Sequence, residues 1–388
     1  MPQKTGTRKR VLAAMSGGVD SSLTAFLLKE AGYEVIGVTM RIWDEEKGFP
    51  SYTAGDVYGC CGVSAVDDAR RVAQQLGISF YVLNLQEQFE EEVISYFCEE
   101  YLRARTPNPC ILCNEKLKFG ALLKKARELE ATFISTGHYA RVEYDRTRGR
   151  YLLKKGKDAQ KDQSYVLFSL SQNQLSHALF PLGRSRKEDV RKKAKVLGLR
   201  VHERPESQEI CFIPGMDYRP FLRSRVSQEI EAGDIVDTKG HILGTHKGLP
   251  FYTIGQRRGL GIPAGKPLYV VGFDRERNLL IIGEKREVYG TGLIANRVNW
   301  IAMDKLRQPT RMKAKIRYGH RGADAIIEPS TDGTVKVVFA QPQEAITPGQ
   351  AVVFYRGDIV MGGGWIERAL TDGEEGWESN RQARRRSA

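Results

Sequence analysis

The sequence predicts an α/β protein: a parallel-sheet domain, then a small β-rich central domain, then a C-terminal β-barrel. Three observations support this. Apolar strand-like runs alternate with amphipathic stretches through the first half, which is typical of a parallel sheet with helices on both faces. After Asp217 the chain becomes rich in glycine, β-branched and aromatic residues. From about Thr291, apolar and polar residues alternate between turn signals, which indicates a small antiparallel barrel.

The elements follow in order along the chain. The first domain is predicted for residues 1–216, with strands at 10–14, 34–42, 79–83 and 132–136 and helices at 21–31, 64–76, 87–103 and 115–128. Residues 151–214 are expected to be mostly helical. The central domain is predicted for residues 217–290 and the barrel for residues 291–370. The remaining tail, residues 371–388, is predicted to be disordered.

Charge and hydropathy restrict the class of protein. The 388 residues carry a net charge of +13, with a pI near 9.4 and a mean hydropathy of −0.41. This excess of positive charge favours a polyanionic partner, nucleic acid first, with generic solubility charge as the alternative. No apolar stretch approaches the roughly 20 residues of a membrane span. The first residues are basic and then apolar, but too briefly for a signal peptide, so we expect a cytoplasmic protein with no membrane partner.

A glycine-rich turn follows the first predicted strand. The stretch "AMSGGVDSS", residues 14–22, leads directly into a predicted helix. Gly17 and Gly18 can adopt φ > 0 and let the backbone approach a ligand. The N–H groups at the start of the helix, with the serine hydroxyls, suit a phosphate or pyrophosphate. An ordinary helix cap is the alternative, and the turn is neither a Walker A loop nor a G-x-G-x-x-G motif.

Cysteines form a second cluster of candidates. The chain has six, at positions 60, 61, 98, 110, 113 and 211, and in an intracellular protein we do not expect them to form disulfides. In "RTPNPCILCNEKLKFGALL", residues 105–123, Pro107 and Pro109 are expected to hold an extended loop ahead of a basic helix. Cys110 and Cys113 could be metal or cluster ligands, a redox pair or buried thiols. Cys211 is either a buried strand cysteine or a partner thiol for this pair.

These motifs together resemble a known family. The turn resembles the pyrophosphatase loop of the ATP pyrophosphatases, whose signature is SGGxDS, and the chain as a whole resembles the tRNA-specific 2-thiouridylase family. The matching segments are collinear and include "GVTMRIW", "GCCGVSAVDDARRVAQQLGI", "TPNPCILCNEKLKFG", "STGHYAR", "KDQSYVLFSL", "ESQEICFI", "GLPFYTIGQRRGLG", "KIRYGH" and "TPGQAVVFY".

The resemblance implies an enzyme, a tRNA-uridine 2-sulfurtransferase with a nucleotide-binding domain of the ATP pyrophosphatase type. Such enzymes cleave ATP to AMP and pyrophosphate, adenylate the C2 oxygen of the uridine at the wobble position, and transfer sulfur from a cysteine persulfide. The partners implied are the anticodon stem-loop of tRNA and a persulfide donor protein such as a cysteine desulfurase or a relay. The cofactors implied are ATP and Mg²⁺.

The resemblance also assigns residues. ATP contacts are implied at Ala14, Met15, Ser16, Gly17, Gly18, Val19, Asp20, Ser21, Met40 and Gly137, with Asp20 near Mg²⁺ and catalytic. Cys211 is implied to carry the persulfide and Cys113 to be the nucleophile or partner thiol. Contacts with tRNA are implied at Asn108, Pro109, Cys110, His138, Lys161, Asp162, Gln163, Arg317, Tyr318 and Gln350.

One departure from the family pattern leaves the mechanism open. Many members have Asp, thought to assist catalysis, where this chain has Cys110. A thiol there lets Cys110, Cys113 and Cys211 be considered as ligands of a [4Fe–4S] cluster with one open iron, as an alternative to the persulfide route. More remote alternatives are a small-molecule ATP-pyrophosphatase synthetase and a non-enzymatic tRNA-binding module. Cys60, Cys61 and Cys98 have no assigned role.

Overall fold

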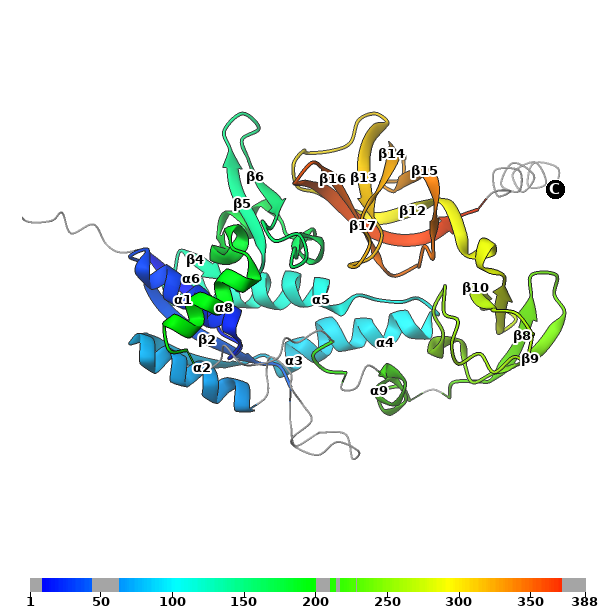
Figure 1. The fold of residues 1–388 in the computed structure, drawn as a ribbon, viewed down its shortest axis with the longest axis horizontal. Coiled ribbons are helices and arrows are strands. Elements are labelled where there is room, and N and C mark those ends of the chain that lie inside the picture. Colours follow the sequence, from blue (N-terminus) through cyan, green and yellow to red (C-terminus); the bar gives the residue numbers. More distant parts are fainter. Residues whose placement is uncertain (1–8, 44–62, 200–209, 214–216, 228, 372–388) are drawn as a thin grey trace, which may run out of the picture. The chain divides into compact units, whose positions relative to one another are not determined.

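The computed structural model describes residues 9–43, 63–199, 210–213, 217–227 and 229–371. The chain forms two compact units, drawn as a ribbon in Figure 1. The first contains residues 1–95, 109–222 and 358–360, and the second contains residues 96–108, 223–357 and 361–388. The segment 96–108 therefore belongs to the second unit, although in sequence it lies between two stretches of the first. Cys60, Cys61 and most of the predicted tail lie outside the described residues.

The first unit is built on a five-stranded parallel sheet with the order β3-β2-β1-β4-β7. Its strands are β1 Arg10–Ala14, β2 Glu34–Arg41, β3 Ser79–Asn84, β4 Phe133–Ser135 and β7 Ala178–Leu179. Val11, Leu12 and Ala13 of the central strand β1 are fully buried, so both faces of the sheet are covered. This burial explains the continuous apolar run, and the predicted parallel α/β fold is confirmed.

The strand order reverses at β1. The chain runs from β1 to β2 on one side and reaches β4 on the other, and both strands pair with β1 in parallel. In open parallel sheets, a crevice at the carboxyl ends of the strands forms at such a reversal and commonly binds the ligand. The glycine-rich turn leaves β1 at this point.

Helices cover the sheet where amphipathic stretches predicted them. The helices α1 Val19–Glu30, α2 Val63–Leu76 and α8 Lys187–Val196 contribute to one core cluster with β1 and β2. Two longer helical runs contain a π-helical stretch each: α3 Gln86–Phe89, Glu90–Ile94 (π) and α4 Ser95–Leu102, then α5 Pro109–Leu112, Cys113–Ala121 (π) and α6 Leu122–Glu128. Shorter elements are α7 Gln172–Ser176, α9 Tyr218–Arg225 and the 3₁₀ turns Ser164–Leu167 and Pro181–Arg184.

The expectation that residues 151–214 are mostly helical was wrong at its start. The strands β5 Ala140–Asp145 and β6 Arg150–Lys155 form an antiparallel hairpin. Tyr144 and Tyr151 lie opposite each other across it, with ring centroids 5.0 Å apart. Aromatic pairs across two strands stabilise a hairpin, and the cross-strand partner of Tyr151 lies before the stretch that was expected to be helical.

The second unit contains two β structures and the segment 96–108. The central sheet has the order β10-β11-β8-β9, made of β8 Gly233–Asp237, β9 Ile242–His246, β10 Tyr269–Asp274 and β11 Leu279–Gly283, with 3₁₀ turns at Leu249–Phe251 and Lys285–Val288. The strands β12 Tyr289–Trp300, β13 Thr310–Lys315, β14 Ala323–Pro329, β15 Val335–Glu344, β16 Ala351–Arg356 and β17 Ile359–Leu370 follow. Pairing of β12 with both β15 and β17 closes them into the predicted C-terminal barrel.

Within the described residues, no helix is both long enough and apolar enough to cross a bilayer.

Candidate active site

The turn after β1 is shaped by two glycines with different roles. Gly17 has φ +67°, and a β-carbon there would lie 2.5 Å from the carbonyl oxygen of Ala65 in α2. Only glycine fits that position without displacing the backbone of α2. Gly18 is extended, with φ −90° and ψ 164°, and caps α1. A β-carbon on Gly18 would have the Ser16 hydroxyl as its nearest neighbour, at an ordinary contact distance of 3.6 Å, so there is room for a methyl group at this position.

The serine hydroxyls hold the turn in shape. The hydroxyls of Ser21 and Ser22 donate to the carbonyl oxygen of Gly18 at 3.1 and 2.9 Å. The backbone N–H of Ser16 donates to the Ser21 hydroxyl at 3.1 Å. The first intrahelical bond of α1 runs from Ser22 N–H to Gly18 at 3.1 Å, so the N–H groups of residues 19–21 have no acceptor within the helix. The positive end of α1 and these N–H groups can receive an anion.

Asp20 is held from two sides. The Tyr139 hydroxyl donates to Oδ1 at 2.7 Å, and the Lys187 ammonium donates to Oδ2 at 2.6 Å. The Lys187 side chain is 9% exposed and that of Asp20 is 31% exposed. The backbone N–H of Lys187 donates to Asp158, and this bond is the main reason that the pKa of Asp158 lies below its usual range. Asp20 therefore keeps a fixed orientation with one side accessible to solvent.

A single carboxylate with the phosphates of a nucleotide is the usual arrangement around Mg²⁺ in phosphate-processing sites. Asp20 fits the role of that one protein ligand, because its oxygens retain lone pairs beside the hydrogen bonds that they accept. The described part of the chain contains no group of three or more His, Cys, Asp or Glu side chains placed to hold a metal ion. In this turn, Asp20 is the side chain that would contact a Mg²⁺ held by nucleotide phosphates.

The residues implied to contact ATP come together at the carboxyl ends of β1, β2 and β4. Met15 N–H donates to Val38 of β2 at 2.8 Å, and the Thr39 hydroxyl donates back to the carbonyl of Met15 at 2.7 Å. Met40 follows on the same strand and is buried. Gly137, just after β4, packs so closely on α1 that a β-carbon would lie 3.0 Å from both Asp20 Cβ and Ser21 N.

His138 is a buried, neutral side chain. Its Nδ1 lies 2.7 Å from the Thr136 hydroxyl, and its ring packs near Phe119 and Phe180, with centroids 6.3 and 6.0 Å away. Burial first, and the charge of Lys118 second, hold the pKa of His138 well below 6.5. The imidazole therefore carries no positive charge at neutral pH.

Cys110 and Cys113 lie on a helix rather than in an extended loop, so that expectation was wrong. Pro109 is the first residue of α5, because its fixed φ suits the first helical position and its missing N–H would have no partner there. Cys110 is exposed and Cys113 is partly exposed. Cys113 opens the π-helical stretch, where the Gln174 side-chain amide donates to the carbonyls of Glu115 and Phe119 at 2.9 and 3.0 Å. Such π-helical turns often mark functional sites.

Cys211 is partly exposed and sits in a turn, not in the strand that its apolar neighbours suggested. The adjacent Phe212 packs against Phe89 and Phe221, with ring centroids 5.5 and 5.3 Å away. All three candidate ligands of a [4Fe–4S] cluster are described residues, and the structure does not gather them into a metal-binding group. The [4Fe–4S] cluster stays an alternative that no metal-binding group among the described residues supports.

The segment 161–163 is mostly engaged in holding its own backbone. Asp162 is buried, and its carboxylate accepts from Gly156 N–H at 3.0 Å and from the backbone and hydroxyl of Ser164 at 3.1 and 2.9 Å. The Gln163 side-chain carbonyl accepts from Tyr139 N–H at 3.0 Å. Lys161 is partly exposed.

In the second unit, Arg317 and Tyr318 stand at the surface of the barrel. Arg317 Nη1 donates to the carbonyl of Glu344 at 3.0 Å, and Tyr318 is 45% exposed. His320 shapes this loop: its Nδ1 accepts from Gly322 N–H at 3.2 Å. Arg317 lines a cavity of about 340 Å³ together with Thr106, Thr253, Ile254, Gly255, Glu344, Ala345, Thr347 and Gln350. An exposed ring and a guanidinium beside a cavity of this size suit an unstacked base.

Sequence reasoning missed two residues that hold the Asp20 side chain in the nucleotide turn, Tyr139 and Lys187. Tyr139 stands within the quoted "STGHYAR" motif, directly after His138, so the motif offered a signal. Lys187 is separated from Asp20 by 167 residues, and nothing in its own surroundings distinguishes it from the other lysines of α8.

Comparison with protein families gives three matches along the chain. Residues 9–215 match the model described as a tRNA methyl transferase HUP domain, residues 219–284 a tRNA methyl transferase PRC-barrel domain, and residues 290–366 an aminomethyltransferase beta-barrel domain. The HUP match alone covers more than half of the chain.

Curated relatives match nearly the whole chain. The chain is 56% identical over 361 residues to tRNA-specific 2-thiouridylase MnmA 2 of Caldanaerobacter subterraneus subsp. tengcongensis. The aligned region covers 93% of this chain and 98% of the relative. It is 54% identical over 361 residues to tRNA-specific 2-thiouridylase MnmA of Acetivibrio thermocellus, covering 93% of this chain and 100% of the relative. It is 56% identical over 360 residues to the MnmA of Halothermothrix orenii, covering 92% and 99%.

Proposed function

Because the chain belongs to the tRNA-specific 2-thiouridylase family, we propose that it replaces the C2 oxygen of the wobble uridine of tRNA with persulfide sulfur. The chain is an enzyme of tRNA thiolation, with tRNA as its substrate. The observation that carries the proposal is the identity of 54–56% to 2-thiouridylases over 93% of the chain. The intact SGGxDS turn at the carboxyl end of β1 supports it independently.

The first step is adenylation. The uridine O2 attacks the α-phosphorus of ATP, an O–P bond forms, and the bond to pyrophosphate breaks. The start of α1 and the side of Gly18 that has room for a ligand would receive the phosphates. Asp20 would hold Mg²⁺, which would supply positive charge beside the pyrophosphate. Tyr139 and Lys187 keep the Asp20 carboxylate in one orientation. The adenylated oxygen then leaves as AMP.

The second step is sulfur transfer. Cys211 carries a persulfide, and its terminal sulfur bonds to C2 as the C2–O bond breaks and AMP leaves. The Cys113 thiolate attacks the Cys211 sulfur, which breaks the S–S bond, forms a Cys113–Cys211 disulfide and leaves sulfur on C2. A dithiol reductant then restores both thiols, and a persulfide donor protein reloads Cys211. The partial exposure of both cysteines supports access to these reactants.

Two features of the surface support binding of the anticodon region. The net charge of +13 favours a polyanion, and Arg317 with Tyr318 provides a guanidinium and an exposed ring on one loop. Cys110 supplies no carboxylate, so the proton-transfer role suggested for Asp in many relatives falls to another group in this chain. Because Cys110 is exposed and lies one helical turn before Cys113, it can act as a reserve thiol in the exchange.

The test measures both products. Purified protein is incubated with a tRNA transcript, ATP, Mg²⁺ and a persulfide donor, and the nucleotides and nucleosides are quantified. We expect AMP and pyrophosphate, formed only with tRNA, and 2-thiouridine in the RNA. ADP and phosphate in their place would refute the nucleotide step, and AMP without 2-thiouridine would refute the sulfur step. Protein prepared without oxygen should be active without bound iron, whereas activity that follows iron content would favour the cluster alternative.

A further inference from the structure

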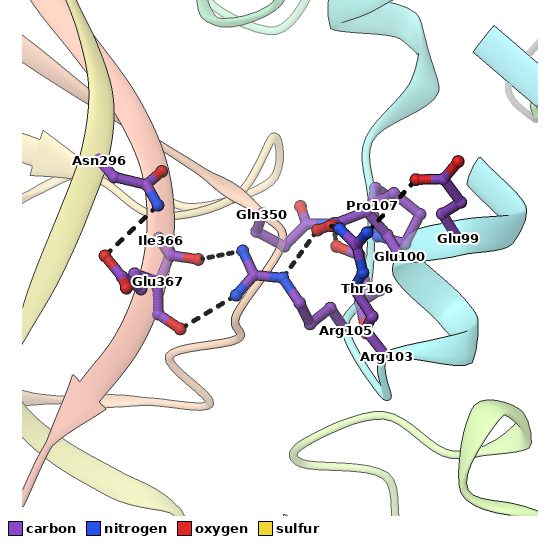
Figure 2. A network of polar contacts seen from close by, with 10 residues as sticks. All are labelled: Glu99, Glu100, Arg103, Arg105, Thr106, Pro107, Asn296, Gln350, Ile366 and Glu367. Carbon is purple, nitrogen blue, oxygen red and sulfur yellow. Dashed lines mark hydrogen bonds and ion pairs between the residues drawn. The ribbon is translucent and has the colours of Figure 1, made fainter. Parts of the chain in front are cut away.

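The backbone that leads into Cys110 is attached to the barrel by a glutamine. We define the stem as residues 105–108 and the TPGQ turn as residues 347–350. The side-chain amide nitrogen of Gln350 donates to the carbonyl of Thr106 at 2.9 Å and to that of Pro107 at 3.3 Å, as drawn in part in Figure 2. Thr106 N–H donates in turn to the carbonyl of Pro348 at 2.9 Å. Both backbone polar groups of Thr106 are thus bonded to the TPGQ turn.

The approach of the two backbones requires glycine at position 349. Gly349 has φ +91°, and a β-carbon there would lie 2.9 Å from Thr106 N and 3.0 Å from Thr106 O. The TPGQ turn is itself fixed to β17, since Gly349 N–H donates to Ile366 at 2.9 Å and Ile366 N–H donates to Gln350 at 2.8 Å. The turn is therefore a rigid support for the stem rather than a mobile loop.

Arg105 makes a second, independent attachment. Its Nη1 and Nη2 donate to the carbonyls of Glu367 and Ile366 at 3.2 and 3.1 Å, and its Nε donates to Glu100 of α4 at 2.8 Å (Figure 2). The Glu100 side chain is only 7% exposed, and it pairs with Arg103 at 3.6 Å as well as with Arg105. One guanidinium thereby joins α4, the stem and β17.

The stem is stiff enough to pass on this attachment. Between Thr106 and Cys110 the chain reads Pro107-Asn108-Pro109, and each proline fixes its own φ and restricts the residue before it. The position of Thr106 and Pro107 therefore restricts the backbone of the stem as far as Asn108.

We propose that Gln350 and Arg105 are positioning residues for sulfur transfer: they hold the stem, the backbone that directly precedes Cys110 in sequence, in one conformation. The role rests on the proposed function, because it concerns the same sulfur transfer. It differs from the tRNA contact that the family resemblance implies for Gln350. The amide nitrogen of Gln350 already donates to two stem carbonyls, so a hydrogen bond from it to RNA would compete with its hold on the stem.

The test compares three variants of the full-length protein. Gln350→Met keeps the length of the side chain and removes its donors, and Arg105→Lys keeps the charge opposite Glu100 but loses the paired bonds to β17. Gln308→Met is the matched control, since Gln308 is an exposed glutamine of the same barrel region. Circular dichroism and the thermal midpoint establish that each variant folds.

Hydrogen exchange of the Thr106 amide reports on the stem without tRNA, ATP or activity. Loss of the Gln350 bonds should raise its exchange rate about tenfold, in line with the net strength of one or two hydrogen bonds. Gln308→Met should exchange like the wild type. An unchanged rate in folded Gln350→Met would overturn the proposal, and this outcome does not depend on whether the protein thiolates tRNA.

Kinetics separate positioning from RNA contact. For Gln350→Met and Arg105→Lys we expect kcat for thiolation to fall about tenfold, while the Kd for tRNA stays within about twofold of wild type. A raised Kd with an intact kcat at saturating tRNA would identify Gln350 as an RNA contact and contradict the positioning role. If the wild type makes no 2-thiouridine, the proposed function fails, whereas the exchange result still decides the attachment.

Discussion

The adjacent glycines of the nucleotide turn provide a sharp internal comparison. Gly17→Ala places a β-carbon 2.5 Å from the Ala65 carbonyl oxygen, in a backbone with φ +67°. The left-handed conformation costs alanine about 1–2 kcal/mol, and the overpacking costs about 1–3 kcal/mol more. We therefore expect the free energy of unfolding of the first unit to fall by about 2–5 kcal/mol, a drop of about 4–20 °C in its thermal midpoint.

Gly18→Ala is the control, because there is room for the same methyl group at φ −90°. Its stability should equal or slightly exceed that of the wild type, since alanine restricts the unfolded chain. Its affinity for ATP should nevertheless fall, because the methyl group occupies the side where the phosphates are proposed to lie. Thermal unfolding followed by circular dichroism and ATP titration give both quantities. Equal midpoints for the two variants would refute the steric reasoning, and unchanged ATP affinity in Gly18→Ala would refute the placement of the phosphates.

Three further predictions concern charge and thiol chemistry. Burial keeps His138 neutral in the folded protein, so the unfolded chain binds the proton more readily. The free energy of unfolding should therefore fall as pH drops below about 6.5, by at most about 1.4 kcal/mol per pH unit. Urea unfolding at several pH values should show that His138→Gln lacks this part of the pH dependence, and an unaltered pH dependence would contradict the reasoning. Lys187→Met should lower the rate of tRNA-dependent pyrophosphate release, because the Asp20 carboxylate loses the partner that fixes its orientation. A wild-type rate in the folded variant would show that the ion pair has no role in the site. Cys113→Ser and Cys211→Ser should each abolish formation of 2-thiouridine while pyrophosphate release persists, since a hydroxyl cannot replace a thiolate. Thiolation by either variant would exclude the substituted cysteine from sulfur transfer.

Local patterns predicted the parts of the fold that depend on neighbours in sequence. The strand β1 and the turn at Gly17 and Gly18 could be located from a few residues each. A buried strand requires consecutive apolar residues, and a positive φ favours glycine. Pro109 was misread because proline both ends helices and begins them, and only the helix that follows decides between the two.

The contacts that complete the site join residues far apart along the chain. Lys187 is 167 residues from Asp20, and Gln350 is 244 residues from Thr106. Neither side chain stands out locally, because a lysine at a helix start and a glutamine before a strand are both ordinary surface residues. Only the packed structure shows that one is buried against a carboxylate and that the other holds two carbonyls of the stem.

We propose that this chain places sulfur on the wobble uridine of tRNA in an ATP-dependent reaction. The most direct measurement is mass mapping of nuclease fragments from a tRNA transcript, incubated with the protein, ATP, Mg²⁺ and a persulfide donor. We expect one fragment, the one that contains the wobble uridine, to gain the mass of one oxygen-to-sulfur exchange. Omission of ATP or use of Cys211→Ser should prevent this gain. Sulfur at another nucleotide, or an unmodified anticodon alongside normal cleavage of ATP, would contradict the proposed function.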